Sequence, residues 1–385
     1  MEKAKSVLVY GLSTEGYMIA SSLASKSIST VLLDEKLHVA TEVNKQILSN
    51  YSSAQELIDA ESLLSIKPEK NAISENLIIF FTPKIRETDD YKKQIFSTLD
   101  ELSKNISKDT MIFNCVPVGH GTNFEMIEII ERSSGLSSET DFSYSYLPLN
   151  PQTTKAISFG INNPDNKKII QTYAKNANIT YDNVLDIDLS ELLHLQKISL
   201  LYSPIISEAE SLKKINNYAN RMLLQNPIHY VDDISNQLTD VRSFSTTLES
   251  GDPSLYIISG ILRGIESYIR FFIDQLKLFM KENSLKASRT EIYLCWSIDK
   301  SEIRGDKSYI HNRMIDKISD IVGNVNDIND YKITKNNKTT FYLPATEKKQ
   351  LLILGSLNDE KILKTLKGKL KDNIFLIHAN TICTR

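Results

Sequence analysis

A glycine-containing turn between a short strand and a helix lies near the start of the chain and constrains its fold most. The apolar run Val7-Leu8-Val9-Tyr10 ends at Gly11, and a helical spacing of apolar residues begins after Gly16. A second strand is predicted over Ser29–Leu33, and it ends at Asp34, 23 residues after Gly11. A βαβ unit with an acidic residue at the end of its second strand is typical of a dinucleotide-binding domain.

Two more strands of the buried type follow in the same half of the chain. Leu77–Phe81 and Met111–Cys115 are apolar runs, and a polar segment with helical spacing separates them. Continuous apolar runs are typical of parallel strands that are covered on both faces. The sequence therefore predicts an α/β fold, with a Rossmann-like dinucleotide-binding domain over residues 1–185.

The rest of the chain changes character twice. From about Leu189 to Lys281 the apolar spacing is helical, and Leu255–Met280 is the longest such segment. Strand and helix patterns then alternate again, over Glu291–Trp296, Asn312–Val322, Leu351–Leu354 and Ile374–Ile377. We expect a helical central domain over residues 186–285 and a smaller carboxyl-terminal α/β domain over residues 286–385. The polar stretch 324–340 is expected to be an irregular surface insertion.

Composition excludes several classes of partner. The 45 basic and 48 acidic residues give a formal net charge of -3, without the basic excess that nucleic acid or an anionic membrane attracts. The three cysteines are too scattered for a disulfide framework or a metal site. The amino terminus lacks the apolar core of a signal peptide, and no apolar run reaches 18 residues. We expect a cytoplasmic protein without a bound metal.

The glycine turn predicts NAD as the cofactor. In such loops the second glycine lets the backbone approach the pyrophosphate; here Ser13 takes that place, and its hydroxyl could bond a phosphate oxygen. Asp34 favours NAD over NADP, because a carboxylate accepts from the ribose 2′-OH and repels a 2′-phosphate. The predicted cofactor-binding residues of this unit are Gly11, Ser13, Thr14, Gly16 and Asp34. The alternative is an ordinary βα turn that holds no cofactor.

Cys115 ends a predicted strand at the edge where open parallel sheets place ligands. A reactive thiol is one interpretation. No charged neighbour in the sequence would activate it, so an inert buried cysteine is the other. Cys295 and Cys383 fit structural or incidental roles.

Several segments, taken in order, resemble one enzyme family. Asn114-Cys115-Val116-Pro117-Val118-Gly119-His120-Gly121-Thr122 resembles the S-T-V-P-V-G-T turn of the UDP-glucose/GDP-mannose dehydrogenases, and Gly11–Gly16 resembles their dinucleotide loop. Phe81-Thr82-Pro83 resembles the strand end beside the nicotinamide, and Asn150-Pro151-Gln152 resembles N-P-E. Ser190–Leu195 resembles A-E-x-x-K-L. Further matches are Glu302-Ile303-Arg304 to D-[VI]-R and Leu376–Asn380 to the closing strand.

The resemblance covers most of the chain and implies roles for further residues. Thr82, Pro83 and Cys115 would border the cofactor. A nucleotide-sugar would be held by Asn150, Gln152, Arg263 and Arg304, because guanidinium groups suit phosphate. Either arginine could equally be an ordinary solvated side chain. The helical domain would form a homodimer, and the apolar stripe Tyr268–Phe279 favours core or dimer packing over a ligand site.

The chain departs from the family at the residues that carry the reaction. Family members oxidise a sugar alcohol to a carboxylate in two NAD-dependent steps through a thioester on a cysteine, but no cysteine lies between Gly160 and Glu291. Ser243–Asp252 stands where that segment is expected. The paired lysine and asparagine of the family align with His194 and Ile198, and Gln152 replaces the glutamate of N-P-E.

His194 is therefore the candidate catalytic residue, as an acid or base near neutral pH, unless it is an ordinary polar residue at a helix start. Two hypotheses for the protein follow. One is an NAD-dependent oxidoreductase that acts on a nucleotide-sugar or related hydroxy compound without the covalent step. The other is a non-catalytic family member that keeps the architecture for sensing or assembly.

Overall fold

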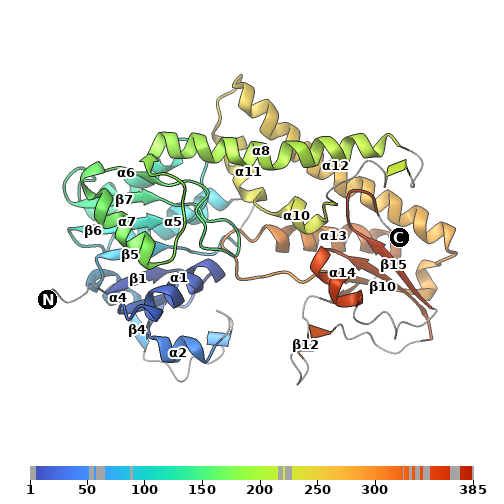
Figure 1. Ribbon diagram of the computed structural model, residues 1–385, viewed down its shortest axis with the longest axis horizontal. Coiled ribbons are helices and arrows are strands. Elements are labelled where there is room, and N and C mark those ends of the chain that lie inside the picture. The colour runs from blue at the N-terminus through green and yellow to red at the C-terminus, as the bar shows by residue number, and fades with distance from the viewer. Residues whose placement is uncertain are drawn as a thin grey trace. The chain divides into compact units, whose positions relative to one another are not determined.

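The computed structural model describes residues 6–51, 56–57, 66–86, 90–215, 220–221, 228–323, 325–328, 332–333, 339–340, 347–364 and 373–383 (Figure 1). The chain forms two compact units. The first comprises residues 1–199, 239–255 and 301–305, and the second comprises 200–238, 256–300 and 306–385. The residues that were predicted to form a central helical domain are divided between the two units, and the three-domain division remains a prediction.

The first unit contains a nine-stranded sheet with the order β4-β3-β2-β1-β5-β6-β7-β8-β9. Its strands are β1 Val7–Tyr10, β2 Thr30–Asp34, β3 Val39–Val43, β4 Ile66–Pro68, β5 Ile78–Phe81, β6 Thr110–Asn114, β7 Phe142–Tyr146, β8 Gly160–Ile161 and β9 Leu185–Asp186. Its helices are α1 Thr14–Ser25, α2 Lys45–Ser49, α4 Glu69–Glu75, α5 Tyr91–Ser103, α6 Thr122–Ser134, η2 Pro164–Asn166 and α7 Lys167–Asn176.

The centre of this sheet is parallel, which confirms the α/β prediction. Strands β2, β1, β5, β6 and β7 run in one direction. Strand β3 is antiparallel to β2 and β4, and β8 is antiparallel to β7 but parallel to β9. The predicted sheet did not include these antiparallel strands. The connection from β2 to β3 spans only residues 35–38, and a connection that short permits only antiparallel pairing.

Helices cover both faces of the first sheet. Because β2 and β5 flank β1 on opposite sides, right-handed crossovers place α1 on one face and α5 and α6 on the other, as Figure 1 shows for α1 and α6. All residues of β1 and β5 are buried, and the rings of Phe80 and Phe113 stack at 4.5 Å between centroids. Apolar burial on both faces explains why these strands read as continuous apolar runs.

Long helices dominate the middle of the sequence. They are α8 Ile187–Lys213, α10 Val231–Ser235, α11 Leu238–Thr247 and α12 Pro253–Glu282. Within the second unit, α8 and α12 approach closely at Gly264, where an added Cβ would lie 2.2 Å from Ile206 Cγ2. The stripe on α12 is mostly core, since Tyr268, Ile269, Phe272, Ile273, Leu276 and Phe279 are buried.

The second unit also contains a parallel four-stranded sheet with the order β11-β10-β14-β15. Its elements are η3 Ala287–Arg289, β10 Thr290–Cys295, α13 Asp306–Val322, β11 Asn326–Ile328, β14 Lys349–Leu354, α14 Leu357–Lys364 and β15 Ile374–His378, with the hairpin β12 Lys332–Ile333 and β13 Thr339–Thr340.

The prediction of an irregular insertion over residues 324–340 was wrong for its first part. Strand β11 pairs with β10 there, although two of its three residues are polar, because an edge strand is held by backbone hydrogen bonds that need no apolar side chain. The rest of this stretch is the hairpin or lies outside the described residues. Among the helices of the described segments, none is long and apolar enough to cross a bilayer.

Candidate functional site

The carboxyl edge of the first sheet brings several predicted site residues together. Strands β1, β5 and β6 are consecutive neighbours, and the residues that follow them are Gly11, Thr82-Pro83 and Cys115. Thr82 ties two of these ends together, because its backbone amide donates to Tyr10 O at 2.7 Å and its hydroxyl donates to Gly11 O at 3.1 Å. This edge is where open α/β sheets bind ligands.

Both glycines of the predicted dinucleotide loop are required by its geometry. Gly11 has a φ of 114°, and an added Cβ would lie 2.4 Å from the backbone of Thr82. A Cβ on Gly16 would lie 2.6 Å from Gly11 O. The loop therefore has the tight turn and the close helix–strand approach that the sequence predicted.

The hydrogen-bonding groups of this loop are engaged within the protein. The Ser13 hydroxyl is fully buried and accepts from Gly16 N at 3.0 Å, which makes Ser13 the N-cap of α1. The backbone amide of Thr14 donates to Ser301 O at 2.7 Å. The amide of Leu12 donates to the carboxylate of Glu35 at 3.0 Å.

Asp34 lies at the end of β2 as predicted, but its carboxylate faces its own turn. Its Oδ1 accepts from the backbone amides of Lys36 at 2.8 Å and Leu37 at 3.2 Å. The next residue, Glu35, is the one that contacts the glycine loop, and it also accepts from Lys84 N and Arg86. The carboxylate beside the loop is therefore Glu35.

Glu15 is a buried acid in the first turn of α1. Its two carboxylate oxygens accept from Gln152 N and Ile303 N, each at 2.9 Å. Burial raises the pKa of Glu15, and these amide hydrogen bonds oppose that rise. Gln152 thus contacts the loop through its backbone, at a φ of 56°, whereas its side chain is exposed. Asn150 precedes it, and its backbone pairs with Lys155 O.

His194 lies in a buried chain of polar groups. Its Nδ1 is 2.8 Å from the Tyr146 hydroxyl, and its Nε2 is 2.8 Å from Asp240 Oδ2. The ring of Phe244 packs edge-on at 5.2 Å, and His194 has no exposed surface. Burial lowers the pKa of His194 although Asp240 opposes this, so the neutral ring that donates to Asp240 and accepts from Tyr146 fits the geometry.

Arg304 is the last member of this series of hydrogen-bonded side chains, beyond Asp240. Its guanidinium donates two bonds to Asp240, at 2.5 Å from Nε and 2.8 Å from Nη2, and both side chains are buried. Burial by itself would raise the pKa of Asp240, but the charge and hydrogen bonds of Arg304, with those of His194, outweigh it and lower that pKa. Arg304 is therefore held by a carboxylate inside the first unit. Arg263 lies on α12 in the second unit and is exposed.

Cys115 is fully buried, and burial followed by the nearby charge of Glu15 raises the pKa of its thiol. A protonated, buried thiol is chemically inert. The following turn is covered by α11, since a Cβ on Gly119 would lie 2.4 Å from Ser243 O. Ser243 is buried too, and its hydroxyl donates to Asp240 O at 2.7 Å. The segment aligned with the family's cysteine segment thus contributes a packed helix here.

A second buried carboxylate holds the start of α6. Glu191 accepts from Gly121 N at 2.7 Å and from the backbone and side chain of Asn123. His120 Nδ1 lies 3.3 Å away. A carboxylate at a helix amino terminus satisfies free amides and complements the helix dipole. Glu191 therefore fixes the turn that follows β6.

Sequence reasoning missed five of these side chains: Glu15, Glu35, Tyr146, Glu191 and Asp240. Glu15 and Glu191 stand inside the quoted motifs, so an acid among the loop glycines and another before His194 were available signals. Tyr146 and Asp240 lie 48 and 46 residues from His194 in the sequence, and no local pattern connects residues so far apart.

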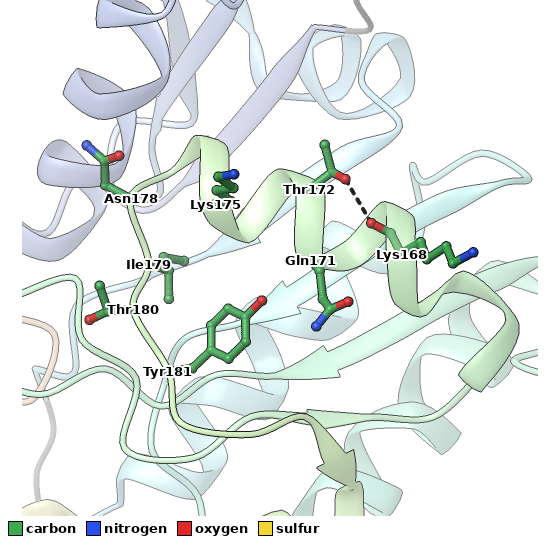
Figure 2. Close-up of a pocket in the computed structure, with 8 residues that line it drawn as sticks. All are labelled: Lys168, Gln171, Thr172, Lys175, Asn178, Ile179, Thr180 and Tyr181. Atoms are coloured by element: carbon green, nitrogen blue, oxygen red, sulfur yellow. Dashed lines mark hydrogen bonds between the residues drawn. The ribbon is translucent and has the colours of Figure 1, made fainter.

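An open depression of about 910 Å³ lies along α7 in the first unit (Figure 2). Figure 2 shows Lys168, Gln171 and Lys175 on the helix, with Thr180 and Tyr181 on the segment that follows it. The predicted site residues do not line this depression. It is distinct from the carboxyl edge described above.

The second unit has a polar cluster of its own at the ends of β10 and β14. Trp296 is fully buried, and its indole N–H donates to Asp232 at 2.8 Å, where Lys307 also lies at 2.9 Å. Asp359 accepts from Ser297 N at 3.2 Å and from the Ser356 hydroxyl at 2.6 Å. Burial, reinforced by the charge of Asp232, raises the pKa of Asp359 to about 7.

Comparison with solved structures identifies this arrangement of elements. The chain superposes on UDP-D-ManNAc dehydrogenase from Pyrococcus horikoshii with a TM-score of 0.64 at 14% identity, covering 99% of this chain and 96% of that one. The chain has the fold of the nucleotide-sugar dehydrogenases.

Two other solved dehydrogenases agree with this fold. For UDP-glucose dehydrogenase from Pyrobaculum islandicum the TM-score is 0.55 at 14% identity, over 97% of this chain and 85% of that one. For UDP-N-acetyl-mannosamine dehydrogenase from S. aureus the TM-score is 0.56 at 11% identity, over 98% of this chain and 99% of that one. No protein-family model and no curated protein sequence matches the chain.

Proposed function

We propose that this chain is a non-catalytic protein on the nucleotide-sugar dehydrogenase fold, which binds a nucleotide-sugar or related small molecule without oxidising it. The burial of His194 carries this proposal. A general acid or base must reach the proton that it transfers, yet both ring nitrogens of His194 are bonded to Tyr146 and Asp240. The serine in the aligned cysteine segment, Ser243, is buried as well.

A turnover assay tests this proposal. The purified protein, with NAD and a panel of UDP- and GDP-sugars, is expected to give no rise in NADH absorbance, while the P. horikoshii dehydrogenase serves as the active control. At least one of these sugars should raise the melting temperature of the protein. NADH formation that is abolished in His194→Ala would overturn the proposal and establish an enzyme.

Arg263 supplies a matched pair of variants for the binding half of the proposal. Arg263 is exposed, whereas Arg304 is buried. Planar guanidinium groups suit phosphate. Arg263→Ala should reduce the thermal shift caused by the nucleotide-sugar, whereas Arg270→Ala, also exposed on α12, should leave it unchanged. Equal shifts in both variants would remove Arg263 from the binding site.

An NAD-dependent oxidoreductase is the second candidate function. The observation in its favour is the glycine turn, because Gly11 and Gly16 keep the tight geometry that a dinucleotide loop requires. In that case Thr82, Pro83 and Cys115 would border the nicotinamide, and Asn150 and Gln152 would contact the sugar. The same turnover assay decides between the two candidates.

We also propose that the protein is a homodimer that uses α8. Leu189, Leu192 and Leu200 are spaced near whole helical turns and are 52%, 48% and 67% exposed. Exposed leucines on one helical face are typical of an interface. Light scattering should show a dimer for the native protein and a monomer for Leu200→Glu, with Ser97→Glu on α5 as the control. A native monomer would contradict this proposal.

The cytoplasm is the proposed location. Its support is that the structure joins none of Cys115, Cys295 and Cys383 in a disulfide, as is typical of a reducing compartment.

A further inference from the structure

The glycine loop of the first unit poses a separate question, which is what occupies its hydrogen-bond donors. A dinucleotide binds such a loop by placing its pyrophosphate against free backbone amides at the start of the helix. The backbone of this loop is suitable, since Gly11 and Gly16 permit the tight turn. Whether a pyrophosphate fits depends on the amides and on the charges around them.

Three amides of the loop, those of Leu12, Thr14 and Gly16, already have acceptors from the same chain. Thr14 N donates to the carbonyl of Ser301, and Leu12 N donates to the carboxylate of Glu35. The third acceptor is the Ser13 hydroxyl, to which the backbone amide of Gly16 donates. A phosphate oxygen would have to displace these groups, and each displaced buried group would lose its partner.

The charges around the loop also oppose a pyrophosphate. Glu15 has no exposed surface, and Glu35 has a side chain that is 8% exposed. Both are bonded to backbone amides at the loop or next to it, through Leu12, Gln152 and Ile303. Negative charges repel one another strongly where water is excluded. The residues present therefore do not fit the pyrophosphate of NAD.

The loop instead forms hydrogen bonds with a short segment that lies far away in the sequence. Residues 301–305 belong to the first unit, although the residues on both sides of them belong to the second. Ser301 accepts from Thr14, Ile303 donates to Glu15 and accepts from Ile85 N at 2.6 Å, and Arg304 pairs with Asp240. Three of these five residues are thus held by hydrogen bonds or ion pairs to α1, to α11 and to the loop that follows β5.

We infer that the dinucleotide loop of this chain has become a socket for its own segment Ser301–Gly305, which takes the place of a cofactor. The loop, with Glu15 and Glu35, anchors that segment in the first unit. This inference goes beyond the proposed function, because a non-catalytic protein could still bind NAD as an effector.

Titration of the full chain with NADH tests the inference directly. No saturable binding is expected up to millimolar NADH, either in calorimetry or in NADH fluorescence. Hydrogen exchange followed by mass spectrometry should show slow exchange for the peptides that contain Thr14 and Ile303, unchanged by NADH. Saturable binding, with faster exchange at residues 301–305, would overturn the inference. Binding without turnover would leave the proposed function intact.

A matched pair of variants tests the anchoring role. Glu15→Gln replaces the acceptor of one amide by a donor, so residues 301–305 should exchange faster and the melting temperature should fall. Glu125→Gln is the same change in the first turn of α6 at an exposed position, and it should alter neither quantity. If hydrogen exchange at residues 301–305 is unchanged in a folded Glu15→Gln protein, Glu15 does not anchor this segment and the inference is overturned. If that variant does not fold, the titration of the native chain still decides.

Discussion

Replacing Asp240 by Asn is expected to destabilise the first unit by about 3–5 kcal/mol, the usual cost of removing one partner of a buried ion pair. Asp240 is the sole acid that bonds both Arg304 and His194 in the described structure. The asparagine has nearly the same shape, so the change isolates charge from packing. The NH₂ group of the asparagine would also face an N–H donor of Arg304 or His194, and two donors cannot form a hydrogen bond with each other.

The reason for this large effect is the desolvation of Arg304. Its side chain is 1% exposed, so water no longer solvates the guanidinium charge. The carboxylate of Asp240 compensates for that lost solvation. The lowered pKa of Asp240 means that this carboxylate stays charged under ordinary conditions. Its contribution to stability is present above the pKa of the unfolded state and is lost as the pH falls through the lower folded pKa.

Urea denaturation followed by far-UV circular dichroism measures the effect, and hydrogen exchange of α11 localises it to the first unit. Asp182→Asn is the matched control, because Asp182 pairs with Lys197 at the surface and such pairs contribute about 0–1 kcal/mol. If the two variants lose similar free energy, Arg304 finds another partner and the buried pair does not stabilise the fold.

The second unit is expected to lose stability as the pH rises from about 4 to about 7, because of Asp359. Its pKa is raised from an ordinary 3.8 to about 7, so the folded state binds a proton more tightly than the unfolded state. The free energy of unfolding therefore falls over this window and is level above it. The full contribution is on the order of 4 kcal/mol, from the difference between the two pKa values.

Asp359→Asn should remove this pH dependence. The amide mimics the protonated acid, because its oxygen can still accept from Ser297 N and its amide group can donate to the Ser356 hydroxyl. The variant should match the native protein below about pH 4 and exceed its stability at pH 8.

Trp296 makes this measurement specific to the second unit. It is the single tryptophan of the chain, and it lies buried in the same polar cluster. Its fluorescence during urea denaturation at several pH values reports the unfolding of that unit. Asp320→Asn, at an exposed position on α13, should keep the native pH dependence. If Asp359→Asn also keeps it, another group causes the change.

The amino-terminal half of the fold could be predicted well from local patterns. The apolar runs predicted β1, β5 and β6 to within one residue at each end, because buried parallel strands need apolar side chains on both faces. Gly11 and Gly16 predicted the turn, since only glycine fits those two positions. The polar strand β11 escaped prediction because an edge strand carries little apolar signal.

The candidate site could be predicted only in part. The sequence placed Gly11, Thr82 and Cys115 at the ends of predicted strands, and the structure showed that these strands, β1, β5 and β6, are neighbours. It assigned Asp34 and His194 by their positions in motifs, and it could not foresee that Asp34 bonds its own turn or that His194 bonds Asp240. These hydrogen bonds depend on side-chain orientation and on residues far away in the sequence.

The sequence by itself determined the strand–turn–helix unit and the absence of a cysteine between Gly160 and Glu291, because both can be read from residue types at known positions. Only the tertiary structure decided which groups the glycine loop and His194 contact. It brought Ser301 to Thr14, Ile303 to Glu15, and Asp240 between His194 and Arg304. Such contacts arise when segments separated by tens to hundreds of residues fold together, and a buried polar group must then find a partner wherever the fold supplies one.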